Sequence, residues 1–187
     1  MRDRSAVTAW TMYETGAGCG VLAASEHGVV AHHLPYGAKS AAEALELAAA
    51  LYPRATGENE LTAKGAALLR RYFGGERVVF DLPLDLDGCT PFQKNVYHVV
   101  AAIPYGTVLS YQDVAGACGS PRGARAIGGA MARNLVPIII PCHRVVGANG
   151  VMTGFTAPGG TDSKRELLSM EGVNLDAKGG VTWAKIR

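Results

Sequence analysis

Apolar and polar residues alternate along residues 7–36, the spacing of strands that bury one face of a sheet. Glycine-containing, turn-prone stretches interrupt this alternation, so we expect a small antiparallel sheet at the start of the chain. Ser40 and Glu43 then have the spacing of a capping box, and Pro53 follows an Ala- and Leu-rich run. This pattern predicts a helix that ends before Pro53, because the residue before a proline is disfavoured in helical conformation.

A second helix and a further strand are predicted before a boundary in the chain. Helical spacing covers about residues 59–73 and meets the glycine pair at 74–75, a signal for a helix C-terminus. Residues 77–82 have the composition of another strand. Residues 83–91 are rich in turn formers, and we therefore place a boundary there.

Beyond the boundary the pattern changes to short helices. They are predicted over residues 92–103, from the capping pair Ser110 and Asp113 to Gly119, and over residues 122–133. Ser120 as N-cap and Pro121 at the first helical position predict the start of the last one. Two short helices joined by a tight Gly-Ser-Pro turn predict a helix-turn-helix.

The last helix of this motif carries Gly123, Gly128 and Gly129. Each glycine weakens a helix by roughly 0.5–1 kcal/mol relative to alanine, so this composition requires a reason. Either the helix backbone approaches another molecule closely, or it packs tightly against a neighbouring helix. The sequence does not distinguish these two explanations.

The predicted elements give an α/β (α+β) fold. A small N-terminal antiparallel sheet with helices occupies residues 1–87, and a mostly helical domain with the helix-turn-helix occupies residues 88–175. Residues 176–187 are predicted to form a C-terminal tail.

Composition places the chain among ordinary globular proteins, with 48% hydrophobic and 18% charged residues. No stretch approaches 18 uncharged apolar residues, so no membrane span is expected, and the polar residues 1–4 argue against an export signal. The four cysteines form no CxxC pair, which favours free thiols and a cytoplasmic protein, or a nuclear one in a eukaryote.

The charges are unevenly distributed. Residues 1–87 carry eight Lys/Arg and eleven Asp/Glu, whereas residues 88–175 carry seven and four. The second half could therefore face a polyanion, although ordinary scatter over a solvated surface explains the same numbers.

The most informative segment is residues 136–146, where a predicted buried apolar strand leads into Cys142, His143 and Arg144. A thiolate is the reactive form of cysteine, and nearby cationic side chains lower the thiol pKa. We therefore expect a lowered pKa at Cys142. A Cys-His pair alone is weak evidence, since many free cysteines are inert core residues.

The wider string resembles the methylated-DNA–protein-cysteine methyltransferases, also called O6-alkylguanine-DNA alkyltransferases. Their signature Pro-Cys-His-Arg-Val is present at residues 141–145. Further matching pieces occur in the same order: Thr-Pro-Phe-Gln at 90–93, Ile-Pro-Tyr-Gly at 103–106, Ser-Tyr-Gln at 110–112, Ala-Arg-Ala at 124–126, Gly-Gly-Ala-Met at 128–131, Asn134, Asn-Gly at 149–150, and Lys164, Leu167, Leu168, Glu171 and Gly172.

The resemblance implies a reaction without a cofactor. Cys142 would accept an alkyl group from O6-alkylguanine, or from O4-alkylthymine, in double-stranded DNA. His143 would act as a base through a water, Glu171 would orient the imidazole, and Asn134 would brace the active-site turn. Without the resemblance, the sequence favours a solvated charge at a helix end as the interpretation of Glu171.

The resemblance also implies how DNA is bound. The second helix of the motif would enter the minor groove, and Arg125 would fill the space of an extruded nucleotide. Small residues would let the backbone approach the groove, namely Ala124, Ala126 and Gly128. Tyr111 would contact the flipped base, and the base pocket would include Met131, Val145, Phe155 and Thr156. A monomer is expected.

Two features depart from the family. Phe155 stands where tyrosine is usual, and its loop is about two residues longer, so the alkyl groups accepted are open. Some members bind zinc through N-terminal residues, but Cys19, His27, His32 and His33 lack metal-ligand spacing, and we predict no metal site.

Two other functions compete with alkyl transfer. A lesion-binding protein of the alkyltransferase-like group has tryptophan at the acceptor position, and Cys142 argues against it. A cysteine hydrolase would use Cys142, His143 and Glu171 for multiple turnover, but it leaves the helix-turn-helix unexplained.

Overall fold

The computed structural model describes residues 6–182 and divides the chain into two compact units, Met1–Gly88 and Cys89–Arg187. A three-stranded antiparallel sheet with helices is followed by a mostly helical part, so the predicted fold class is confirmed. Predictions for residues 1–4 and 183–187 fall outside the described range. No helix within that range combines the length and apolar character that a membrane crossing requires.

The first unit is built on the sheet β1-β2-β3, formed by Ala9–Thr15, Gly18–Ala24 and Val29–Ala38. A tight turn at residues 16–17 joins β1 to β2, and Trp10 pairs with Ala23 and Tyr13 with Gly20. Strand β2 is apolar and buried along nearly its whole length. Because successive side chains of a strand point to opposite faces, this burial requires both faces of the sheet to be covered.

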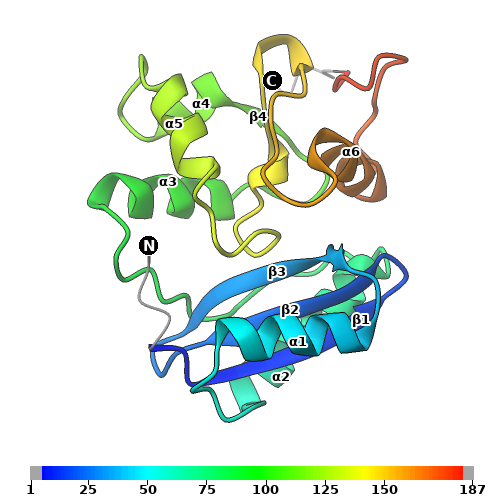
Figure 1. Cartoon of the computed structure of the whole chain (residues 1–187). Coiled ribbons are helices and arrows are strands. Elements are labelled where there is room, and N and C mark those ends of the chain that lie inside the picture. Colours follow the sequence, from blue (N-terminus) through cyan, green and yellow to red (C-terminus); the bar gives the residue numbers. More distant parts are fainter. Residues whose placement is uncertain (1–5, 183–187) are drawn as a thin grey trace. The chain divides into compact units, whose positions relative to one another are not determined.

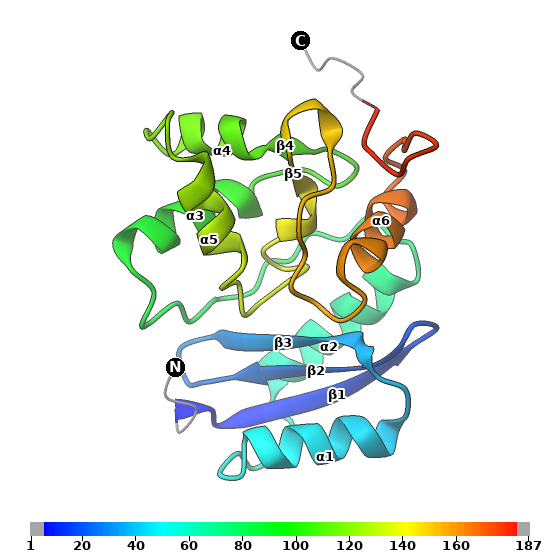
Figure 2. The same ribbon diagram turned by 45° about the horizontal axis from the view of Figure 1, so that its top comes forward.

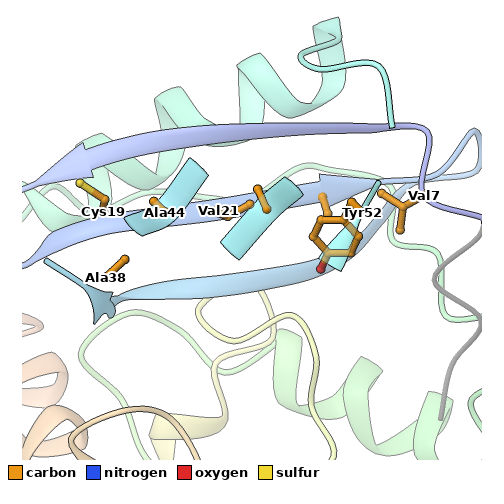
Figure 3. Close-up of a cluster of buried hydrophobic side chains, with 8 residues drawn as sticks. Val7, Cys19, Val21, Ala38, Ala44 and Tyr52 are labelled. Carbon is orange, nitrogen blue, oxygen red and sulfur yellow. The ribbon is translucent and has the colours of Figure 1, made fainter. Parts of the chain in front are cut away.

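Helices α1 (Ala41–Leu51) and α2 (Glu60–Phe73) cover opposite faces of this sheet (Figures 1 and 2). On the α1 side, Val21 packs with Ala44 and Tyr52 in a buried apolar cluster (Figure 3). On the other side, the Thr11 hydroxyl donates to that of Thr62 on α2 at 2.7 Å. The core of this unit therefore has two layers, one on each side of the sheet.

Two local predictions in the first unit are wrong. Residues 77–82 form no strand; the backbone makes one isolated bridge at Leu84 to Val29, because Pro83 has no N–H to extend a ladder. The capping box of α1 is only half formed. Ser40 accepts from the Glu43 amide, but the Glu43 carboxylate accepts from the Lys39 amide instead of that of Ser40.

The second unit contains α3 (Pro91–Ala101), α4 (Tyr111–Ala117), α5 (Ala124–Met131) and α6 (Gly160–Met170). Full capping boxes start α3 at Thr90 and α4 at Ser110, the latter as predicted. The two-residue strands β4 (Leu109–Ser110) and β5 (Val145–Val146) pair in parallel between them. This pair connects the start of α4 to the segment that carries Cys142.

The predicted start of α5 is wrong. Ser120 does not cap the helix; its carbonyl accepts from the Gly123 amide at 2.7 Å, and helix begins only at Ala124. The Gln112 side chain on α4 donates to the Pro121 carbonyl, so residues 120–123 are held as a turn. The two helices lie side by side in both views (Figures 1 and 2).

Candidate active site

Cys142 follows a tight turn, and the buried strand predicted before it is wrong. Residues 137 and 140 form only an isolated bridge, and Ile138 has a positive φ of 72°. The Asn134 side chain closes this turn: its amide donates to the Ile140 carbonyl at 2.9 Å and its oxygen accepts from the Val136 amide at 3.0 Å. Two prolines without N–H groups in the same segment prevent a regular ladder.

Cys142 is the first residue of the 3₁₀ helix η2 (Cys142–Arg144) and is 8% exposed. Burial raises the pKa of this thiol, opposed by a hydrogen bond from Asn134, the charge of Lys164 and the backbone amides of Cys142 and His143. The lowered pKa expected from the sequence is therefore wrong, because desolvation outweighs the nearby donors and charge. The resting thiol is protonated.

His143 is fully buried, and its Nε2 lies 2.7 Å from Oε1 of Glu171. Burial lowers the pKa of His143, although Glu171 opposes this effect. The imidazole is therefore neutral at rest, the form that can accept a proton. Cys142 and His143 together form a neutral thiol–imidazole pair.

Glu171 is a buried carboxylate at the C-terminus of α6, 5% exposed, and not the solvated charge that the sequence left open. Besides His143, its oxygens accept from Nε and Nη2 of Arg144 at 2.9 Å each and from the Gly106 amide at 3.1 Å. Burial alone would raise the pKa of Glu171, but His143 and Arg144 outweigh it and hold the pKa far below its ordinary range. Glu171 is thus a fixed anion.

Two further cations, Arg144 and Lys164, belong to this site, although the site residues predicted from the sequence did not include them. Arg144, in addition to its bonds with Glu171, donates Nη1 to the Ile103 carbonyl at 2.7 Å. Lys164 is 1% exposed, donates to the Val145 carbonyl at 2.5 Å, and has a pKa lowered to about 8 by burial. Its position on the stripe shared with Leu167, Leu168 and Glu171 was the available signal.

Tyr111 lies beside this group at the first position of α4. The Lys164 ammonium is 6.0 Å from the centre of its ring, and its hydroxyl donates to the Thr153 carbonyl at 3.4 Å. Burial raises the pKa of Tyr111, and a thiolate at Cys142 would act in the same direction. Cys142, Lys164 and Tyr111 are therefore electrostatic neighbours.

The glycines of α5 have room around them. A Cβ on Gly128 would come no closer than 3.9 Å to the Tyr111 ring, and one on Gly129 would lie 3.5 Å from Arg133. These are ordinary contacts, so packing inside the chain does not require glycine there. Of the explanations left open, close approach to another molecule is favoured. Arg125 and Ala126 are exposed on this helix, whereas Ala124 is half-buried.

The residues predicted for the base pocket come from two elements and one irregular segment. Met131, 6% exposed, ends α5, and the fully buried Val145 lies in β5. Half-buried Phe155 and exposed Thr156 lie in the segment after η3 (Ala148–Gly150), which has no regular secondary structure.

Among residues 6–182, no group of three or more His, Cys, Asp or Glu side chains is placed to hold a metal ion. Successive residues of β3 point to opposite faces of the sheet, so His32 contacts Tyr13 and His33 contacts Tyr52. Cys19 lies in the buried cluster under α1, and His27 is exposed in a turn.

Residues 91–173 match the family model described as 6-O-methylguanine DNA methyltransferase, DNA binding domain. The chain is 46% identical over 116 residues to the constitutive methylated-DNA–protein-cysteine methyltransferase of Bacillus subtilis. That alignment covers 62% of this chain and 69% of the relative.

Solved structures resemble most of the chain. The crystal structure of Mycobacterium tuberculosis OGT in complex with DNA is 32% identical with a TM-score of 0.71, covering 88% of this chain and 92% of that one. The O6-methylguanine-DNA methyltransferase of Pyrococcus kodakaraensis is 25% identical with a TM-score of 0.64, covering 88% and 99%.

Proposed function

This chain belongs to the 6-O-methylguanine DNA methyltransferase family, and from that premise we propose that it repairs DNA by moving an alkyl group from O6 of guanine to Sγ of Cys142. One observation carries this proposal: the buried Cys142 thiol is followed directly by an imidazole that a fixed carboxylate holds at 2.7 Å. These features support a nucleophile–base–orienter arrangement, as in other activated cysteines.

The proposed chemical step begins with a neutral pair. As the substrate arrives, the thiol proton moves to Nδ1 of His143 through a water, because Nε2 is bonded to Glu171. The thiolate attacks the alkyl carbon, an S–C bond forms, and the C–O6 bond breaks with its electron pair remaining on guanine. The imidazolium at His143 then gives its proton, through the water, to the guanine anion, so the charges balance and His143 is neutral again.

Nearby side chains stabilise the charges that develop in this step. The thiolate, when it forms, is stabilised by the Lys164 ammonium, by the Asn134 side chain and by the backbone amides of residues 142 and 143. Glu171, held by Arg144, stabilises the imidazolium. The product thioether has no leaving group that the protein can expel, so each molecule acts once.

We propose that α5 binds the minor groove of double-stranded DNA and that Arg125 fills the space of the flipped nucleotide. The exposure of Arg125 and the space around the glycines of α5 support this role. Tyr111, Met131, Val145, Phe155 and Thr156 would line the pocket for the extruded base.

A titration with a duplex carrying one O6-methylguanine tests the proposal. One equivalent should add a single methyl mass to the Cys142 peptide, and Cys142→Ala should bind the same duplex without transfer. Product beyond one equivalent would identify a multiple-turnover enzyme. Binding without any added mass would identify a lesion-binding protein instead.

Arg125→Ala tests the flipping role. Unstacking a nucleotide costs a few kcal/mol, so losing the residue that compensates should slow repair of duplex substrate. Free O6-benzylguanine needs no flipping, and its reaction should change much less. Equal losses on both substrates would show that Arg125 shapes the pocket and not the DNA.

A further inference from the structure

The end of the described chain is an ordered turn. Leu175 and Val181 form an antiparallel bridge, and the Thr182 amide donates to the Asn174 carbonyl at 2.9 Å. The Asp176 carboxylate accepts from the amides of Lys178 at 2.8 Å and Gly180 at 2.9 Å. We call residues 174–182 the C-terminal clamp.

The clamp lies on the turn that follows β5. The Val181 amide donates to the Gly150 carbonyl at 2.9 Å. Gly150 has a φ of 76°, and a Cβ there would lie 2.1 Å from the Val181 carbonyl oxygen, so only glycine permits this contact. Val181 also belongs to a buried cluster with Val108, Val146 and Leu168. The clamp therefore holds both β5 and the turn beyond it.

The same turn leads directly to the active site. The Gly147 amide donates to the Val151 carbonyl at 2.8 Å, which fixes the exit of the turn. Two residues later, the Thr153 carbonyl accepts from the Tyr111 hydroxyl. Tyr111 lies beside Lys164, whose charge acts on Cys142. A continuous set of contacts thus connects Val181 to the group around the reactive thiol.

We propose that the C-terminal clamp is a positioning element for alkyl transfer: through Gly150 it places the segment after β5, and so orients Tyr111 beside Cys142. This inference rests on the proposed function. The clamp touches no reacting atom, so its loss should lower the rate of methyl transfer while the Cys142 thiol stays able to react.

Three pairs of variants separate the clamp from general folding. Truncation after Val173 removes the clamp, whereas truncation after Thr182 retains every contact described above. Val181→Pro removes the N–H that Gly150 accepts, whereas Val181→Ala keeps that N–H and loses only methyl groups. Gly150→Ala makes the added Cβ clash with the Val181 carbonyl oxygen. Its control is Gly75→Ala, because Gly75 has a similar φ of 86° and a Cβ there would meet no atom within 4 Å.

The measurements are single-turnover methyl transfer from duplex at increasing protein concentration, and alkylation of Cys142 by iodoacetamide. Removing the clamp, Val181→Pro and Gly150→Ala should each lower the maximal transfer rate at least about tenfold, because a displacement of roughly 1 Å at a reacting group costs about that or more. The rate is taken at saturating protein, so that weaker binding of the flipped base does not enter it. Iodoacetamide labelling should stay within about twofold, since this small reagent does not use Tyr111. The three control variants should behave like the parent protein.

Two results would overturn the inference: transfer at the parental rate in the clamp variants, or equal losses of transfer and of iodoacetamide labelling. If the parent protein itself gains no methyl group, the proposed function fails. Amide hydrogen exchange then tests separately whether the clamp holds the turn after β5. The Gly147 amide should exchange at least about tenfold faster in Val181→Pro than in Val181→Ala, because loss of the clamp opens its turn. Equal exchange would overturn the clamp on its own.

Discussion

Glu171 is held as a carboxylate, because its two oxygens contact His143, both Nε and Nη2 of Arg144, and the Gly106 amide. We predict that Glu171→Gln slows methyl transfer by at least about tenfold, within the general-base range of roughly 10²–10⁴. The amide keeps the shape but loses the charge that stabilises imidazolium at His143. The measurement is single-turnover transfer over about pH 6 to 9.

Asp162→Asn is the matched control for this variant. Asp162 lies on the same helix but pairs with Arg165 at an exposed position, so its neutralisation should leave the transfer rate unchanged. A Glu171→Gln protein as fast as the parent at every pH would contradict the proposed role of the carboxylate.

Lys164 makes both stability and reactivity depend on pH. Its pKa is lowered to about 8 in the folded protein, against about 10.4 in an unfolded chain. Between these values the unfolded chain binds more protons, so this residue makes the free energy of unfolding rise with pH. We predict that Lys164→Met removes that rise, measured by denaturant unfolding of both proteins from about pH 7 to 10. If the free energy of unfolding rises with pH equally in the variant and the parent, the buried charge of Lys164 is contradicted.

The same variant should also transfer methyl more slowly, since the Lys164 charge lowers the pKa of Cys142.

At the scale of elements, we expect the glycines of α5 to lower the stability of the protein while favouring DNA binding. Gly128→Ala should stabilise the protein by roughly 0.5–1 kcal/mol, because the added Cβ fits at 3.9 Å from Tyr111 and alanine is the better helix former. If the helix backbone approaches DNA, the same methyl group should weaken duplex binding by at least about tenfold, or about 1.4 kcal/mol.

Gly116→Ala on α4 provides the comparison. It also adds a methyl group to a helix, and apart from the helix's own backbone no atom of the described residues lies within 4 Å of it. Thermal unfolding should rise for both variants, while fluorescence anisotropy with labelled duplex should change for Gly128→Ala alone. Weakened binding in neither variant would remove the argument that α5 lies against DNA.

Elements with strong local signals were predictable, and those set by long-range contacts were not. Ser110 and Asp113 fixed the start of α4 because both capping hydrogen bonds are local. The start of α5 was misplaced because Gln112, on another helix, holds Pro121 in a turn. The segment before Cys142 has the composition of a buried strand, yet the Asn134 side chain bonds both ends of its turn. Similarly, burial of Arg144 and Lys164 follows from tertiary packing that composition does not reveal.

At the scale of the whole molecule, the small net charge of +2 conceals where cations are available. In the second unit, Lys94, Arg122, Arg125 and Arg133 are exposed on α3 and around α5. We predict that affinity for unmodified duplex falls with salt and is nearly independent of sequence, with a logarithmic slope of about −0.9 for each phosphate contacted.

Arg122→Ala should reduce this slope by about one, because it removes one candidate phosphate contact. The measurement is binding of two unrelated duplexes over a range of salt concentrations. A strong preference between the two sequences, or binding insensitive to salt, would contradict recognition through the phosphate backbone.

The protonated, nearly enclosed thiol of Cys142 has a consequence for the lifetime of the protein. A molecule that can act only once must keep its sulfur intact until it meets a lesion, however long that takes. Peroxides oxidise exposed thiolates fastest, so a thiol that ionises only beside its substrate is protected while it waits. The same burial that makes Cys142 a poor nucleophile at rest therefore preserves its single use, and the more exposed Cys89 should be oxidised before it.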